Sequence, residues 1–438
     1  MQVDKITLQD IGLFDSDNAL GLISHLNFCK TNGGEIHLEK LLTTSLSSIK
    51  AIEQRQDALK IYLQYFEYAN GLKITNGTTL VIEKFFETSL MSIPVQISLP
   101  SAYWYQFFNK SDYSLIKYSV DHLVTFYQNL NNWVSVFEVQ LGNPIIDELI
   151  QKVKKLLAHP SLSRIQFQSQ LKDPKEILSL GYFFIYQYKN NTRSLLECFY
   201  EIDAYYSMAK AFKHYHFEFP TWVDSERPLF EVEAAIHPLL KDPIQNSITL
   251  SNESNLLFLT GANMAGKSTF IKTIGIVIYL AHIGMGAPAK KITLSLMDGL
   301  ITNLTVVDNI TRGESYFFNE VQRIKHTIER IKNGKKYFVL IDELFKGTNI
   351  QDAMKCSIKV IEGLQKMRSS LFIISTHLYE ISAHLTPFSN IQFNYFETEV
   401  KGKELLFHYH LKPGVSQDRI GYLILEREGV VEMLDQLD

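Results

Sequence analysis

Residues 256–270, with the sequence LLFLTGANMAGKSTF, constrain the fold of this chain more than any other stretch. An apolar run is followed by a turn that matches G-x-x-x-x-G-K-S from Gly261 to Ser268. The run predicts a buried strand, and the residues after the turn predict a helix. Such a loop directs backbone N–H groups at nucleotide phosphates, while its lysine reaches the β and γ phosphates and its serine ligates Mg²⁺. The predicted nucleotide-binding residues are Gly261, Ala262, Asn263, Met264, Ala265, Gly266, Lys267, Ser268 and Thr269.

The periodicity changes along the chain near Pro220–Pro228. Up to about residue 225, apolar residues recur at spacings of three and four, which is typical of helices. From about residue 226, short β-rich runs alternate with helical ones, which indicates a parallel sheet flanked by helices. We therefore expect a mainly α-helical domain over 1–225 and an α/β P-loop NTPase domain over 226–438, with an ABC-like, parallel-rich sheet.

Two further apolar runs end in polar residues. YFVLIDEL (337–344) predicts a strand with Asp342 and Glu343 at its carboxyl end, where open parallel sheets bind ligands. Asp342 suits a Mg²⁺ site together with Ser268, and Glu343 suits polarising the attacking water. Adjacent acids favour hydrolysis over small-molecule kinase chemistry. IISTHLYE (373–380) repeats the pattern and predicts a γ-phosphate-sensing role for His377, with a purely structural histidine as the alternative.

A glycine-containing loop precedes a long amphipathic segment at 308–332. Ser315 opens the predicted helix, and a helix start with a hydroxyl and unpaired N–H groups can bind an anion. Simple N-capping by Ser315 is the alternative, although it would leave the loop without a role.

Composition restricts the partners and the cellular location that this chain can have. The chain has 438 residues and a net charge of −4, so it is no polycation, although a local basic face would not show in that figure. Its three cysteines, Cys29, Cys198 and Cys356, lack metal-ligand spacing and are typical of reduced thiols in a cytoplasmic protein. Acidic residues in the first thirty positions argue against a signal peptide. The uncharged run 273–289 is better explained by a buried helix than by a membrane span.

Two aromatic segments, 103–108 (YWYQFF) and 181–188 (GYFFIYQY), have two interpretations. They could be stacking platforms for unpaired bases. We favour packing in the core of long helices, because aromatic side chains dominate core energetics. The lysines of KVKK (152–155) could touch phosphates, but a solvated helix face is the favoured interpretation.

Together these segments resemble the MutS family of DNA-mismatch-recognition ATPases. TGANMAGKSTFIKTIGIVIYLAHIGMGAPA is similar to the family's phosphate loop and following helix, LIDELFKGTN to its D-E-x-x-x-G-T, and STHLYE to its A-T-H-x-x-E. DNITRGESYFFNEV resembles the family's signature loop, whose Gly, Ser, Phe and Glu fall on Gly313, Ser315, Phe317 and Glu320. YHLKPGVSQDRIGYLILEREGV resembles the closing segment. Upstream, TNGGEIHLEKLL and EIDAYYSMAKAF are similar to the start and end of the family's helical core.

The chain also departs from the family pattern. Ala262 and Ala265 replace a proline and a glycine of the phosphate loop, and Phe345-Lys346 replace a Gly-Arg pair. The sequence begins at the helical core and its core is short, so we expect the mismatch-reading domain to be absent and the DNA-gripping clamp to be reduced or absent. The residues of the nucleotide chemistry remain in place.

The resemblance implies an ATP hydrolase that uses ATP and Mg²⁺, binds DNA of mismatched or other non-standard structure, and has no membrane role. It also implies a homodimer in which the loop with Gly313 and Ser315 caps the partner's nucleotide. Three alternatives stay open: a transporter-type or chromosome-maintenance ATPase, an ATP switch that scarcely hydrolyses, and a protein scaffold that binds no DNA. No glutamine-bearing loop or transporter signature supports the first.

Overall fold

In the computed structural model of the chain, the described residues are 1–16, 20–88, 93–140, 142–163, 171–304, 316–401, 404–416 and 421–436. They divide into two compact units. The unit that we call the sheet unit comprises Met1–His25, Ser45–Ile52 and His214–Asp438. The unit that we call the helical unit comprises Leu26–Thr44 and Glu53–Lys213.

This division differs from the expected 1–225 and 226–438 at the start of the chain, because Met1–His25 belongs to the sheet unit. The reason is a two-residue strand, β1 (Gln2–Val3), which pairs in parallel with β7 (Gly299–Asn303). The short helix α1 (Lys5–Asp10) follows, and its Asp10 carboxylate accepts hydrogen bonds from Thr302 Oγ1 at 2.7 Å and Leu304 N at 3.0 Å. The first residues are thus tied to the sheet.

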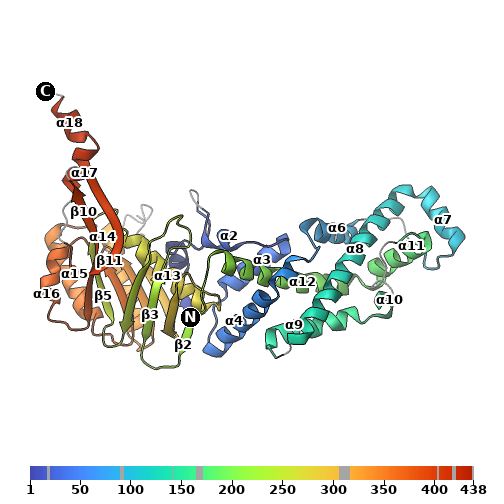
Figure 1. Cartoon of the computed structure of the whole chain (residues 1–438), viewed down its shortest axis with the longest axis horizontal. Coiled ribbons are helices and arrows are strands. Elements are labelled where there is room, and N and C mark those ends of the chain that lie inside the picture. The colour runs from blue at the N-terminus through green and yellow to red at the C-terminus, as the bar shows by residue number, and fades with distance from the viewer. Residues whose placement is uncertain are drawn as a thin grey trace. The chain divides into compact units, whose positions relative to one another are not determined.

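The helical unit contains only helices in its described residues, as the periodicity predicted. Figure 1 shows α8 and α12 as long helices of this unit. The helices in the described part of 22–214 are α2 (Leu22–Leu26), α3 (Asn32–Thr43), α4 (Ile49–Gln64), α5 (Phe66–Asn70), α6 (Asn76–Glu87), α7 (Leu99–Phe108), α8 (Lys110–Phe137), the 3₁₀ turn η1 (Glu138–Gln140), α9 (Pro144–Leu157), α10 (Pro160–Ser163), α11 (Pro174–Tyr182), the π-turn η3 (Phe183–Gln187) and α12 (Lys189–His214).

A buried carboxylate joins the two ends of the helical unit. Asp203 of α12 is 2% exposed and accepts hydrogen bonds from Thr31 N at 2.9 Å, Thr31 Oγ1 at 2.7 Å and Lys30 N at 3.0 Å. Thr31 in turn caps α3 by accepting from Gly34 N at 3.1 Å. A Cβ at Gly34 would lie 2.2 Å from Asp203 Oδ2, so only glycine allows this close approach. Two segments 172 residues apart are held together at one point.

The sheet unit contains a seven-stranded sheet in the order β1-β7-β8-β9-β5-β10-β11 and a four-stranded sheet in the order β2-β6-β3-β4. In the first sheet every pair is parallel except β10 with β11. A mixed, parallel-rich sheet with covering helices confirms the α/β class predicted for this part. The remaining strands are β2 (Thr221–Val223), β3 (Leu229–Ala235), β4 (Asn246–Ser251), β5 (Leu256–Gly261), β6 (Lys291–Ser295), β8 (Tyr337–Asp342), β9 (Leu371–Ser375), β10 (Ile391–Lys401) and β11 (Glu404–Pro413).

Helices cover both faces of the seven-stranded sheet (Figure 1). The helices after β5 that the structure describes are α13 (Lys267–His282), α14 (Tyr316–Ile331), α15 (Ile350–Leu364), the 3₁₀ turn η5 (Tyr379–Ile381), α16 (Ser382–Leu385), α17 (Gly421–Arg427) and α18 (Val430–Asp435). Side chains alternate across a strand, so Val339 and Ile341 of β8 join the apolar cluster under α14 and α15. Leu340 faces the other way, where a Cβ at Gly275 of α13 would lie 3.1 Å from it.

Helix α13 contains residues 273–282 of the uncharged run 273–289, so the run can be compared with the buried helix that was predicted. Its residues from Thr273 to His282 are all buried, as expected for a helix packed within a fold. His282 is fully buried, accepts from Met297 N at 3.0 Å through Nε2, and burial lowers its pKa to about 3. Among the described residues, no helix is both long and apolar enough to cross a membrane.

Candidate nucleotide-binding site

The loop between β5 and α13 has the backbone conformation that its glycines allow. Gly261 has φ +142° and Gly266, which caps α13, has φ +104°, both in the region that favours glycine. A Cβ at Gly261 would lie 3.1 Å from the carbonyl oxygen of Phe396, so the loop passes close to β10. Ala262 and Ala265 are buried, which explains why small side chains stand at both positions. The predicted strand, turn and helix are all present.

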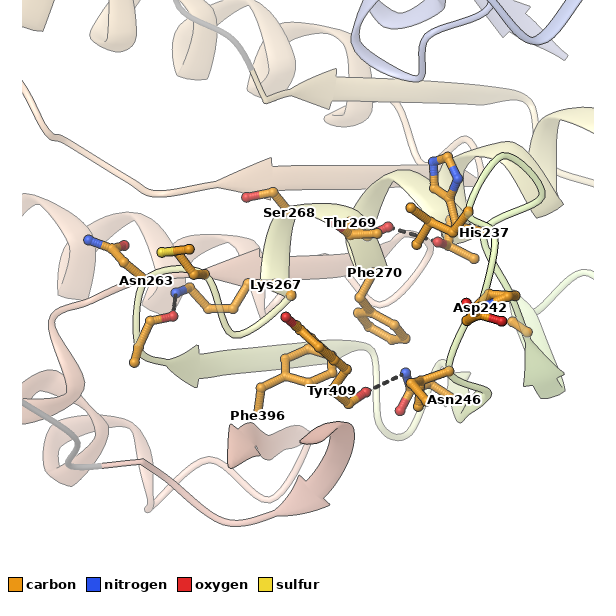
Figure 2. A pocket seen from close by; sticks show the side chains of 18 of the residues that line it. His237, Asp242, Asn246, Asn263, Lys267, Ser268, Thr269, Phe270, Phe396 and Tyr409 are labelled. Carbon is orange, nitrogen blue, oxygen red and sulfur yellow. Dashed lines mark hydrogen bonds between the residues drawn. The ribbon is translucent and has the colours of Figure 1, made fainter. Parts of the chain in front are cut away.

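Lys267 begins α13 and is 5% exposed. Its Nζ donates to the carbonyl oxygens of Gly261 at 2.7 Å and Ala262 at 2.9 Å, so the ammonium group lies inside the loop (Figure 2). Burial lowers the pKa of Lys267 to about 8, and the negative charges of Glu343 and Asp342 oppose that shift. A desolvated cation enclosed by a glycine loop is suited to bind phosphate oxygens.

Asp342 connects three elements at the carboxyl edge of the sheet. It accepts from Ser268 Oγ at 2.5 Å through Oδ2 and from Ser375 Oγ through Oδ1. Ser268 comes from α13, Asp342 from the end of β8 and Ser375 from the end of β9, and these two strand ends are paired in register. No group of three or more His, Cys, Asp or Glu side chains in the described ranges could hold a metal ion by itself.

Glu343 follows β8 with φ +59°, a conformation that non-glycine residues rarely adopt. Its carboxylate lies 2.6 Å from His377 Nε2 and forms an ion pair with Lys346 Nζ. Burial raises its pKa, but the hydrogen bonds from His377 and Lys346 outweigh that effect and lower the pKa to about 2. Glu343 therefore carries a negative charge held between two basic side chains.

Phe345 and Lys346 lie in the loop after β8, at the two positions where the resemblance expects a Gly-Arg pair. Phe345 has φ +57°, so a side chain stands where the backbone conformation favours glycine. It is 5% exposed, and its ring centroid lies 5.8 Å from that of Phe317 in α14. Core packing against α14 thus offsets the backbone strain at Phe345.

Glu320 of α14 supports the same loop, a role that the spacing alone did not show. It is 5% exposed and accepts from Lys346 N at 3.0 Å and Gly347 N at 3.2 Å. A Cβ at Gly347 would lie 2.7 Å from Phe317 N, so the loop after β8 lies directly against the start of α14. Gly313 and Ser315, predicted to act on a partner's nucleotide, lie outside the described residues.

A pocket of about 540 Å³ opens beside the phosphate loop. Figure 2 shows the rings of Phe270, Phe396 and Tyr409 around the start of α13. Asn246 fixes the backbone of β11 there, because it donates to Tyr409 O at 3.1 Å and accepts from Leu411 N at 2.8 Å. Phe270 comes from α13, whereas Asn246, Phe396 and Tyr409 come from β4, β10 and β11, and no spacing in the sequence indicated this set. Of the predicted nucleotide-binding residues, the pocket wall includes Ala262, Asn263, Met264, Gly266, Lys267, Ser268 and Thr269.

Comparison with known proteins agrees with this architecture. The family profile described as MutS domain V matches residues 257–434, which contain the phosphate loop, both acidic strand-end residues and His377. This part of the chain is therefore an α/β domain of the MutS domain V class.

Individual MutS proteins are similar to this chain over about half of its length. The DNA mismatch repair protein MutS of Anaplasma phagocytophilum is 30% identical over 224 residues, which is 50% of this chain and 27% of that protein. The proteins of the same name from Thermotoga maritima and Streptococcus sanguinis are 27% and 24% identical over 52% and 57% of this chain, and 29% of each relative is covered. The chain is therefore similar to these MutS proteins over about half of its own length. The aligned part spans less than a third of the length of these relatives.

Proposed function

We propose that this protein is a MutS-like ATPase of the P-loop NTPase fold that couples ATP binding and hydrolysis in a dimer to engagement of DNA. The observation that carries the proposal is the convergence of Lys267, Asp342 and Glu343 at one sheet edge, beside a pocket of nucleotide size. The free thiols of Cys29, Cys198 and Cys356 are in keeping with a cytoplasmic setting.

The loop and pocket fit a nucleoside triphosphate. The N-terminus of α13 and the buried Lys267 ammonium favour phosphate oxygens at one end of the pocket. The ring of Tyr409 lies against Gly266 in the pocket wall and supplies an aromatic surface for a nucleobase, and Asn246 holds the Tyr409 backbone. Because Lys267 now donates to carbonyl oxygens of its own loop, phosphates would exchange places with those carbonyls as its partners.

Ser268 and Asp342 fit Mg²⁺. A hydroxyl and a carboxylate in direct contact supply oxygen ligands, and Mg²⁺ in phosphate sites is held by one or two such ligands together with the phosphates and water. The ion would neutralise charge on the transferred phosphoryl group. Ser375 keeps Asp342 oriented by donating to its other oxygen.

Glu343 and His377 are the proposed catalytic pair. Glu343 is ionised at neutral pH and orients an attacking water through its carboxylate. His377 lies 2.6 Å from that carboxylate and would contact the γ-phosphate of bound ATP. The loop with Gly313 and Ser315 would complete the site of the partner subunit.

A DNA-binding panel tests the proposal. The full chain is titrated with a mismatched duplex, a junction, a single strand and a perfect duplex of equal length, each with and without Mg·ATP, while phosphate release is measured. We expect ATP-dependent affinity for at least one non-standard structure over the perfect duplex. Equal affinity for all four would contradict a preference for non-standard DNA, and no binding to any of them would favour the scaffold alternative. Absence of phosphate release would remove the ATPase assignment.

A further inference from the structure

The corner where α7 meets α8 exposes an unusual number of large aromatic side chains. Tyr103, Trp104, Phe107 and Phe108 are 58%, 67%, 66% and 60% exposed. The prediction that segment 103–108 packs in the core is therefore wrong for these side chains, while Tyr105 is buried as expected. In segment 181–188 the same prediction is confirmed for Phe183, Phe184 and Tyr188, but it is wrong for Tyr186, which is 53% exposed.

The local geometry explains this exposure. α7 buries only Ala102 and Tyr105, which share one face, and Asn109 ends α7 where α8 begins. The aromatic side chains lie on the remaining surface of α7 and contact one another. The ring centroids of Trp104 and Phe108 are 4.1 Å apart, and those of Phe107 and Phe108 are 5.1 Å apart with their planes near perpendicular.

These rings and the first turns of α8 enclose a surface hollow of about 880 Å³. Lys110 and Lys117 of α8 also line it, and Lys110 Nζ lies 5.4 Å from the centre of the Phe107 ring. None of the described residues that line the hollow is acidic. We call Tyr103, Trp104, Phe107, Phe108, Lys110 and Lys117 the aromatic corner.

Ring faces next to ammonium groups match the two chemical parts of a single-stranded nucleic acid. Unpaired bases stack on aromatic faces, and cations attract the phosphates between them. A paired duplex offers no free base face for such stacking. A second protein copy fits less well, because α7 has ten residues and is about 15 Å long, whereas a stable interface buries about 800 Å² on each partner. Two lysines would also lose hydration in such an interface.

We propose that the aromatic corner binds unpaired nucleotides of DNA by stacking on Trp104 and Phe107, with Lys110 and Lys117 contacting the flanking phosphates. The proposal deepens the function proposed above, since it names the DNA class. It rests on that function only in taking DNA rather than RNA as the strand.

Tryptophan fluorescence gives a direct measurement. Trp104 is exposed, whereas Trp133 is fully buried and Trp222 is half-buried, so base stacking at the corner would quench mainly Trp104. The full chain is titrated with a thymidine oligonucleotide of about 15 nucleotides and with a duplex of the same length, by fluorescence and by anisotropy. We expect quenching by the single strand only.

Single substitutions test whether the single strand binds at the aromatic corner. Trp104→Ala and Phe107→Ala should each weaken single-strand binding by about tenfold, in line with the loss of one stacked base. Lys110→Ala and Lys117→Ala should each reduce the slope of log affinity against log salt by about 0.7. Tyr118→Ala is the matched control, because Tyr118 is 58% exposed on α8 but does not line the hollow, and it should leave affinity unchanged.

Several results would overturn the proposal. They are wild-type affinity in a Trp104→Ala/Phe107→Ala double variant, an equal loss in Tyr118→Ala, or a change of oligomeric state in the double variant, which would indicate a second copy as the occupant. ATP turnover without DNA is measured on the same proteins. A chain that hydrolyses ATP but binds no single strand contradicts this inference alone, whereas quenching without ATP turnover contradicts the ATPase proposal alone.

Discussion

The nucleotide pocket and the aromatic corner differ in how their functional side chains are held. In the sheet unit, Lys267, Asp342 and Glu343 are held by hydrogen bonds or ion pairs to neighbouring protein groups. In the helical unit, the aromatic corner leaves its rings exposed, and the buried polar group Asp203 serves to hold α3 and α12 together. A site organised by strand ends needs ordered polar contacts, whereas a stacking surface needs only accessible rings. The following predictions, ranked by their effect on ATP turnover, test that contrast.

Lys267→Ala should remove detectable Mg·ATP binding and turnover, because it deletes the buried cation beside the phosphate loop. Fluorescent ATP-analogue titration and phosphate release measure both. Lys272→Ala, on the same helix but outside the pocket wall, is the matched control and should keep both activities. Retained nucleotide affinity in Lys267→Ala would show that the pocket is not the ATP site.

Glu343→Gln should bind ATP but hydrolyse it at least about a hundredfold more slowly, as expected for loss of a positioned general base. Asp342→Asn should instead weaken Mg²⁺-dependent binding, since it changes the carboxylate that contacts Ser268. The two variants are compared by single-turnover hydrolysis and by ATP titration at several Mg²⁺ concentrations. Wild-type hydrolysis by Glu343→Gln would refute the water-orienting role.

Mixing Lys267→Ala chains with Ser315→Arg chains should restore part of the activity that each lacks alone. Random pairing gives half heterodimers with one intact site each, so recovery should reach roughly a quarter of wild-type turnover. The assay runs at saturating ATP, with heterodimers verified by differential tags. No recovery despite verified heterodimers, or normal turnover by a strictly monomeric chain, would exclude action of Ser315 across a dimer.

Asp203→Ala should change turnover least while destabilising the chain by about 3 kcal/mol, because it leaves the buried donors of Thr31 and Lys30 unpaired. Denaturant unfolding of the full chain measures the change. Asp57→Ala removes an exposed acid that pairs with Lys60 and should alter stability by less than about 0.5 kcal/mol. Similar losses in the two variants would contradict the anchoring role of Asp203.

The sequence predicted the convergence at the sheet edge because the carboxyl ends of parallel strands meet there. β5, β8 and β9 lie side by side in the sheet. The phosphate loop follows β5, Asp342 ends β8, and His377 comes two residues after the end of β9. The sequence singled out Glu320 by resemblance, but it did not predict the contact of Glu320 with the loop after β8, nor the contributions of Asn246 and Tyr409, because these depend on segments distant in the chain. Glu320 reaches the loop after β8 across 26 residues, and Asn246 contacts β11 across 163. The two-residue β1 was missed because it is too short to show alternation.

The aromatic content of a segment did not predict whether its side chains are buried. Helical periodicity identifies which residues share a face, but not whether another helix covers that face. Segments 103–108 and 181–188 look alike in composition, yet Phe107 is exposed and Phe184 is fully buried. The lysines of 152–155 lie on an exposed face of α9, as predicted, and Lys154 pairs there with Glu138 at 2.6 Å.

The pairing of β1 with β7 has a consequence for the order in which the chain folds. Gln2 pairs with Gly299, so β1 cannot pair in the sheet until about 300 further residues have been synthesised. Contacts between residues so far apart in the chain form slowly. Residues 26–213 emerge in between and contain the whole helical unit. During synthesis on the ribosome, that unit can therefore collapse first, while the start of the chain remains unpaired. Nascent chains that stop before Gly299 should leave residues 1–10 open to proteolysis, and longer ones should protect them.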